Sequence, residues 1–162
     1  MEPTNKLGSR LYKHAVAVLA WLCLLSLLCL PAVDAFPLVP EDLAELKGLW
    51  ESSNGPNWNY ASLNACLVDY GYTRLLGGTW NFTGPFADPC RFTGVLCTCR
   101  IETESCQVLE VVLPCAAAGG HLPRALGSAG LARMTLLDMD TNALTGTIPT
   151  SLSNLPQLQY ID

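Results

Sequence analysis

A repeated apolar pattern near the C-terminal end of the chain constrains the fold more than any other feature. Three apolar positions recur at one constant offset (155 − 131 = 24): Leu131, Met134 and Leu137 return as Leu155, Leu158 and Ile161. Between the two sets lie Asn142 and the segment Gly146-Thr147-Ile148-Pro149. Self-similarity at this period is the mark of stacked structural repeats. One such repeat cannot bury its own apolar face, so it requires neighbours on both sides.

An earlier, degenerate copy of the pattern precedes these two. Its apolar positions are displaced by a slightly larger offset (134 − 108 = 26): Val108, Val111 and Leu113 align with Met134, Leu137 and Met139. Ala116 stands where the later repeat has Asn142. We therefore expect repeats over residues 107–162, the first degenerate, the second complete and the third cut short at Asp162. The incomplete third repeat predicts that the chain is a fragment of a longer protein.

Residues 1–35 have the pattern of a secretory signal peptide. Lys6, Arg10 and Lys13 form a basic start, and the following run over 15–30 is apolar apart from one serine. Val33-Asp34-Ala35 offers small residues for cleavage after Ala35. The run is short for a spanning helix, which requires about 20 apolar residues, and an uncleaved anchor is the alternative. Association with a membrane is expected only through such an anchor or through a segment beyond Asp162.

Composition excludes several classes of function. Only 14% of residues are charged, and the formal net charge is −5, with no basic patch of the kind that binds nucleic acid. Beyond the signal, six cysteines remain, an even number that predicts disulfides in a secreted chain. The chain has no C-x-x-C motif, and His121 is the only histidine after residue 35. We therefore expect no metal site, no cofactor and no redox function.

The region between the signal and the repeats combines a helix with turns. Leu43, Leu46 and Trp50 have the spacing of one helical face. Residues 52–59 have turn chemistry, and a short helix or irregular loop is expected around 61–68. The segment Asp88-Pro89-Cys90-Arg91-Phe92-Thr93-Gly94-Val95-Leu96-Cys97 follows.

Together with the repeats, this segment resembles plant-type extracellular leucine-rich repeat proteins over about residues 41–162. The family motif is D-P-C-x-W-x-G-V-x-C, and Phe92 stands in the position of its tryptophan. The resemblance implies an α/β solenoid: a leucine-rich repeat fold with a short, curved parallel sheet and a disulfide-stapled helical N-terminal cap. The cap would span residues 36–106 and the repeats residues 107–162. A solenoid needs such a cap because its first repeat otherwise exposes an apolar end.

The resemblance also implies the pairing Cys90–Cys97. Cys99–Cys106 would close a hairpin over residues 100–105, which leaves Cys66–Cys115, although six cysteines allow other connectivities. Asn81-Phe82-Thr83 is a sequon, so N-glycosylation of Asn81 is expected in a secreted chain.

In the family, the residues between the apolar strand positions point outward from the concave sheet and bind ligands. The resemblance therefore implies a ligand-binding face made of Glu110, Val112, Thr135, Leu136, Asp138, Asp140, Gln159, Tyr160 and Asp162. Asp138 and Asp162 would share one column, where neighbouring like charges destabilise the sheet. Their repulsion favours a basic ligand or a cation, and a merely solvated acidic face is the simpler interpretation.

These features predict an extracellular recognition module for a protein, peptide or saccharide ligand, secreted or on the outer face of the plasma membrane. A structural scaffold or adhesin component is the alternative. A secreted hydrolase is disfavoured, because the acids have no histidine partner and lie on an open face without a cleft. We expect no enzymatic activity.

Overall fold

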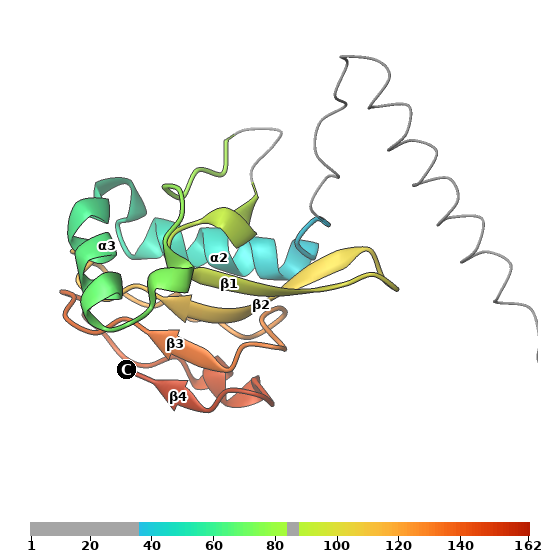
Figure 1. Cartoon of the computed structure of the whole chain (residues 1–162). Coiled ribbons are helices and arrows are strands. Elements are labelled where there is room, and N and C mark those ends of the chain that lie inside the picture. Colours follow the sequence, from blue (N-terminus) through green and yellow to red (C-terminus); the bar gives the residue numbers. More distant parts are fainter. Residues whose placement is uncertain (1–35, 84–87) are drawn as a thin grey trace, which may run out of the picture. The chain divides into compact units, whose positions relative to one another are not determined.

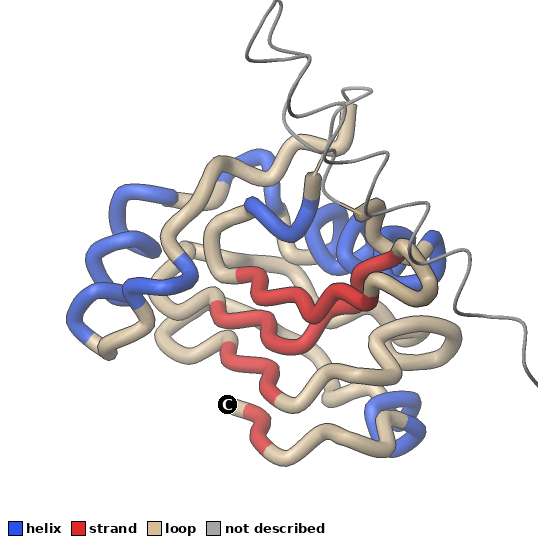
Figure 2. The backbone as a smooth tube through the Cα atoms, turned by 45° about the vertical axis from the view of Figure 1, so that its right-hand side comes forward, coloured by secondary structure: helices blue, strands red, loops and turns tan. Residues whose placement is uncertain are grey.

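The structure is a computed structural model that describes residues 36–83 and 88–162. The predicted signal peptide, residues 1–35, lies outside the described residues. In the described part, four strands form one sheet in the order β1 (Val95–Arg100), β2 (Ser105–Val112), β3 (Leu136–Asp138) and β4 (Tyr160–Ile161) (Figures 1 and 2). No helix in this part has the length and apolar character needed to cross a bilayer.

The sheet is mixed, whereas a wholly parallel sheet was expected. Strands β2, β3 and β4 are parallel, but β1 runs antiparallel to β2. The reason is local: the chain reverses within residues 101–104, and a connection this short can join only antiparallel neighbours. Cys99 and Cys106 lie opposite each other in this hairpin and form a disulfide, as expected for that pair.

Strand register reproduces the two sequence offsets. Glu110 pairs with Leu136 across β2 and β3 (136 − 110 = 26), and Leu136 pairs with Tyr160 across β3 and β4 (160 − 136 = 24). The alignment of the degenerate repeat with the complete one is therefore confirmed. Each inward position then stacks on its equivalent in the next strand, as Val111, Leu137 and Ile161 do.

Asn142 closes the turn that follows β3. Its Nδ2 donates to the carbonyl oxygens of Leu113 at 2.8 Å and Met139 at 2.7 Å, and its Oδ1 accepts from the amide of Ala118 at 2.9 Å. One side chain thus joins two successive repeats. In the first repeat Ala116 cannot make such bonds, and its carbonyl accepts instead from the amide of Asn59 at 2.7 Å.

In the described residues, two α-helices precede the sheet, α2 (Pro40–Ser52) and α3 (Tyr60–Asp69). Of the short helix or irregular loop expected around 61–68, the structure has the helix. Short 3₁₀ turns complete the chain: η1 (Gly55–Asn57), η2 (Thr73–Leu75), η3 (Pro89–Arg91) and η4 (Thr150–Asn154). Pro40 starts α2, and Glu41 and Asp42 place negative charge at its positive N-terminal end.

The buried face of α2 differs from the expected one. Asp42, Leu46 and Leu49 are buried, whereas Leu43 is 36% exposed. The reason is that Asp42 points inward as a hydrogen-bond acceptor. Its Oδ2 accepts from the amide of Val108 at 2.7 Å, and its Oδ1 accepts from the amide of Leu131 at 2.6 Å. The helix is therefore rotated so that a carboxylate, and not Leu43, faces the repeats.

Glu45 extends this contact by one helical turn. Its carboxylate accepts from the amides of Gly127, Ala129 at 2.8 Å and Gly130 at 2.7 Å. The approach is close enough that a Cβ on Gly130 would lie 2.7 Å from the carbonyl oxygen of Glu41. Residues 127–130, between the first two repeats, are therefore a place where α2 attaches.

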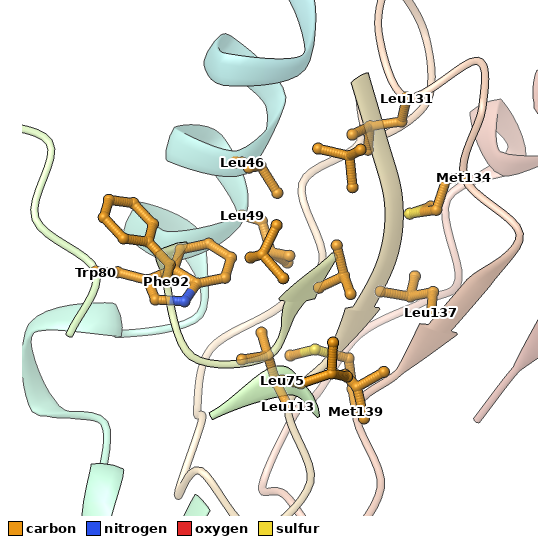
Figure 3. Packing of buried hydrophobic residues seen from close by; sticks show 14 of the residues in the cluster. Leu46, Leu49, Leu75, Trp80, Phe92, Leu113, Leu131, Met134, Leu137 and Met139 are labelled. Carbon is orange, nitrogen blue, oxygen red and sulfur yellow. The ribbon is translucent and has the colours of Figure 1, made fainter. Parts of the chain in front are cut away.

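One apolar cluster joins α2 to the repeats. Figure 3 shows Leu46 and Leu49 of α2 together with Leu131, Met134 and Leu137 of the repeats, all buried. A second group within the same cluster is aromatic, and in it Trp80 stacks on Phe92 with ring centroids 5.6 Å apart. Phe92 thus fills the position of the family tryptophan with a buried aromatic ring.

We predict that replacing Asp42 by alanine destabilises the protein by about 2–5 kcal/mol, because it leaves two buried backbone N–H groups without acceptors. Urea unfolding measures the change in the free energy of unfolding. Glu41→Gln, one residue away and exposed, is the matched control and should change little. An Asp42→Ala variant as stable as that control would show that the two amides find other acceptors.

Candidate functional site

The outward positions of the sheet form rows across β2, β3 and β4. Glu110, Leu136 and Tyr160 lie side by side in the paired register. Asp138 follows Leu137 in β3, and the amide of Asp162 donates to the carbonyl of Leu137 at 3.0 Å, so Asp138 and Asp162 are neighbours at the carboxyl ends of their strands. The structure therefore brings these predicted face residues together.

Residues 59–78, which we call the strap, adjoin this face. Helix α3 lies beside the ends toward which the arrows of β2, β3 and β4 point (Figure 1). From there the strap reaches over the outward side of the sheet. Arg74 Nη2 lies 2.5 Å from Glu110 Oε2, and the hydroxyl of Tyr70 donates to Asp140 Oδ2 at 3.2 Å. Sequence periodicity does not predict this placement.

The strap is fastened at several points. Cys66 in α3 forms a disulfide with Cys115, directly beyond β2. The carbonyl of Leu75 accepts from the amide of Gly94 at 2.8 Å. The expected pairs Cys90–Cys97 and Cys66–Cys115 are both present, as is Cys99–Cys106.

Two residues expected on the exposed face are buried. Val112 is fully buried, and Asp138 is only 5% exposed. The strap contacts Glu110 and Asp140, which lie on either side of Val112 and Asp138 along the face. These contacts place the strap over this part of the sheet. Thr135, Leu136 and Asp140 are half-buried, whereas Gln159, Tyr160 and Asp162 are exposed.

Burial raises the pKa of the Asp138 carboxyl, and the nearby charges of Asp162 and Asp140 raise it further. A hydrogen bond from the amide of Asp140 to Asp138 Oδ1, at 2.9 Å, acts in the opposite direction. The pKa of Asp140 is lowered, first by the hydroxyl of Thr141, which donates to its Oδ2 at 2.8 Å, and also by that of Tyr70. Neighbouring carboxylates on one face thus differ in how readily they ionise.

Tyr160 is linked to the same group. Its hydroxyl donates to Asp162 Oδ2 at 2.9 Å, and this bond with the charge of Asp162 raises the pKa of the phenol. The charge of Asp138 acts on that pKa in the same direction. We call this group the tyrosine–aspartate surface; it consists of Tyr70, Tyr72, Asp138, Asp140, Tyr160 and Asp162.

This surface offers hydrogen-bond acceptors and aromatic rings, which suit binding. It contains no histidine: the amide of His121 donates to the carbonyl of Ser52, at the far end of α2. Among residues 36–83 and 88–162, no three histidine, cysteine, aspartate or glutamate side chains are grouped so that they could hold a metal ion. Asn81 is exposed, and the Thr83 hydroxyl donates to its Oδ1 at 2.6 Å.

The chain is similar to two probable LRR receptor-like serine/threonine-protein kinases of Arabidopsis thaliana. Each is 33% identical over 98 residues, which is 60% of this chain and 9% of each relative. The chain thus spans less than a tenth of the length of the curated relatives it matches. No protein-family model matches it.

Among solved structures, the LRR ectodomain of the receptor kinase SOBIR1 from Arabidopsis thaliana has a TM-score of 0.51 at 17% identity. The match covers 78% of this chain and 54% of that one. The BIR2 ectodomain from the same plant has a TM-score of 0.38 at 21% identity, covering 72% and 63% of the two chains. The resemblance to plant extracellular leucine-rich repeat proteins is therefore confirmed, and the fold is a leucine-rich repeat fold.

We predict that Asp138→Asn is more stable than the unchanged protein at neutral pH, by about 0.5–1 kcal/mol, because it removes a charge that burial disfavours first and the neighbouring carboxylates second. The pKa of Asp138 is higher in the folded protein than in the unfolded chain. Its protonated form therefore contributes its full stability below the unfolded pKa. That contribution is lost as pH rises through the folded pKa. The advantage of the variant should therefore appear as pH rises above the pKa of an unfolded aspartate, about 4.

Thermal unfolding of both proteins across this pH range measures the difference. Asp69→Asn, an exposed aspartate at the end of α3, is the control and should follow the unchanged protein. A stability difference for Asp138→Asn that does not vary with pH would contradict the assignment.

Proposed function

We propose that the chain is an extracellular recognition module that presents the outward face of its sheet to a protein, peptide or saccharide ligand. It would form the N-terminal part of a leucine-rich repeat receptor-like or secreted protein and would have no catalytic activity. The observation that carries the proposal is the row of outward side chains across β2, β3 and β4, which ends in the tyrosine–aspartate surface, where Tyr70, Tyr160 and Asp162 are exposed.

The comparisons support this proposal in its general form. The sequence relatives are receptor-like kinases by name, but the matched part is only 9% of their length. The solved structure with the same fold is described as the ectodomain of a receptor kinase. From the sequence patterns we further propose that residues 1–35 are a signal peptide, residues 36–106 an N-terminal cap and residues 107–162 the start of a solenoid.

An extracellular location has independent chemical support. Three disulfides tie residues 66–115 together, and disulfides persist in oxidising compartments. Two of them close short loops of the proposed cap. The Cys66–Cys115 bridge closes a longer one, with a sequence separation of 49 residues, and fixes the strap beside the face.

We predict that Asn81 carries an N-linked glycan when the chain passes through a eukaryotic secretory pathway. The side chain is exposed, so a glycan can extend into solvent. Digestion with an amidase that releases N-glycans should lower the apparent mass of the secreted chain, and Asn81→Gln should abolish that shift. An unchanged mass for the correctly secreted protein would refute it.

The proposed function is tested by binding of the secreted chain to arrays of extracellular peptides, cell-wall oligosaccharides and secreted ectodomains. Binding should fall when Tyr160 or Asp140 is replaced by alanine, because both residues lie on the proposed face. Glu51→Ala, on the exposed side of α2, should leave binding unchanged. Absence of binding to every probe, or binding that none of the face variants alters, would contradict the function.

A further inference from the structure

We propose that the strap and the sheet together form a two-walled docking surface for a peptide segment that carries a lysine or arginine side chain. This inference rests on the proposed recognition function and specifies its ligand. One wall is the outward edge of β3 and β4, and the other is the strap with Tyr70, Tyr72 and Arg74.

The strap is built as a fixed wall. Its middle is joined to the first repeat by the Cys66–Cys115 disulfide. At its end, the amide of Gly78 donates to the carbonyl of Arg91 at 2.9 Å, and the carbonyl of Gly78 accepts from the amide of Thr93 at 2.8 Å. Three buried leucines anchor its inner side: Leu63, Leu67 and Leu75. A wall held in this way keeps its outer side chains in place before a ligand arrives.

The two walls meet through polar contacts at two places. Arg74 is paired with Glu110 on β2, and Tyr70 is bonded to Asp140 beyond β3. The guanidinium carbon of Arg74 lies 5.6 Å from the ring centroid of Tyr72, which holds that ring beside the face. Tyr160 stands on the opposite wall, where its hydroxyl donates to Asp162, the neighbour of Asp138. Hydrogen bonds and strand pairing thus lead from Tyr70 through Asp140 and Asp138 to β4.

The charge of the surface is uncompensated. The pairing of Arg74 with Glu110 leaves Asp138, Asp140 and Asp162, and in the described part of the chain no lysine or arginine lies within ion-pair distance of these three. Asp138 is the most deeply placed, with 5% exposure. Its Oδ1 accepts from the amide of Asp140, and among the described residues no donor reaches its Oδ2. This oxygen is not one of the buried side-chain atoms that lack a partner, so it remains accessible to a donor that a ligand supplies.

The tyrosines define which donor fits. Tyr70 is 49% exposed and Tyr160 is 47% exposed, one on each wall. Phenol rings attract cations over their faces, and tyrosine is enriched among the residues that contribute most to protein interfaces. A guanidinium or ammonium group between them satisfies both the rings and the carboxylates. A neutral saccharide would leave the charge uncompensated, and an acidic ligand would increase the repulsion.

The test uses the secreted full chain and three probes: a fluorescent decapeptide with two arginines in a glycine–serine background, its glutamine counterpart, and labelled cellohexaose. Fluorescence anisotropy at about 50 mM and about 300 mM NaCl measures the dissociation constants, since salt screens exposed charges at these concentrations. The arginine peptide should bind about tenfold more tightly than the glutamine peptide, and the higher salt should reduce this preference.

Variants on each wall distinguish binding at this surface from general electrostatic attraction of the peptide to an acidic protein. Asp138→Asn and Tyr70→Ala should each weaken binding of the arginine peptide about tenfold. Tyr160→Phe should retain binding because the ring remains, whereas Tyr160→Ala should lose it. Glu102→Gln, at the distant β1–β2 turn, removes the same charge and should have no effect. Circular dichroism and thermal unfolding confirm that each variant is folded.

The outcomes distinguish this inference from the function on which it rests. Binding of cellohexaose or of a secreted ectodomain that requires Tyr160, with no preference for arginine, would overturn the basic-peptide inference and leave the recognition function intact. Equal losses for Asp138→Asn and Glu102→Gln would also overturn it, because the peptide would then respond only to net charge. If no probe shows binding that depends on face residues, both this inference and the proposed recognition function are contradicted.

Discussion

The carboxylate of Asp42 is the interaction on which the rest of the structure depends. Its two oxygens accept from the amides of Val108 and Leu131, which belong to two successive repeats. Burial raises the pKa of this carboxyl, and the two backbone hydrogen bonds oppose that rise. A charged acceptor in the first turn of α2 is also favoured by the helix dipole. Through one side chain, the helix fixes its own rotation and is joined to both segments.

The strap determines the shape of the outward face of the sheet. Because Cys66 is bonded to Cys115 directly after β2, α3 must lie at the carboxyl ends of the strands, and the following residues reach the outward side. The consequence is that Val112 and Asp138, which occupy outward positions, are buried, while Tyr160 and Asp162 stay exposed. The first repeat thus supports the wall, and the later strands supply the open part of the surface.

Periodicity predicted the repeats and the register between the neighbouring parallel strands. It could not predict the burial of Asp138, because the strap that covers it has no period and is positioned by tertiary contacts such as Tyr70 with Asp140. The predicted face of α2 was right for Leu46 and Trp50, which pack in or against the core, but wrong for Leu43. An acceptor for two amides outweighs Leu43, and hydrophobic spacing treats aspartate as a surface residue. The antiparallel β1 belongs to the hairpin expected over residues 100–105, whereas the parallel sheet was inferred from the repeats alone.

The account holds that α2 and the first two repeats form one cooperative unit joined by Asp42. Native-state hydrogen exchange at the amides of Val108 and Leu131 tests this most directly, because both donate to that buried carboxylate. We predict that both amides exchange only through global unfolding, with the same free energy of opening as the core amides of β2. Fast exchange of Leu131 through local opening, while the amides of β2 remain protected, would contradict the account.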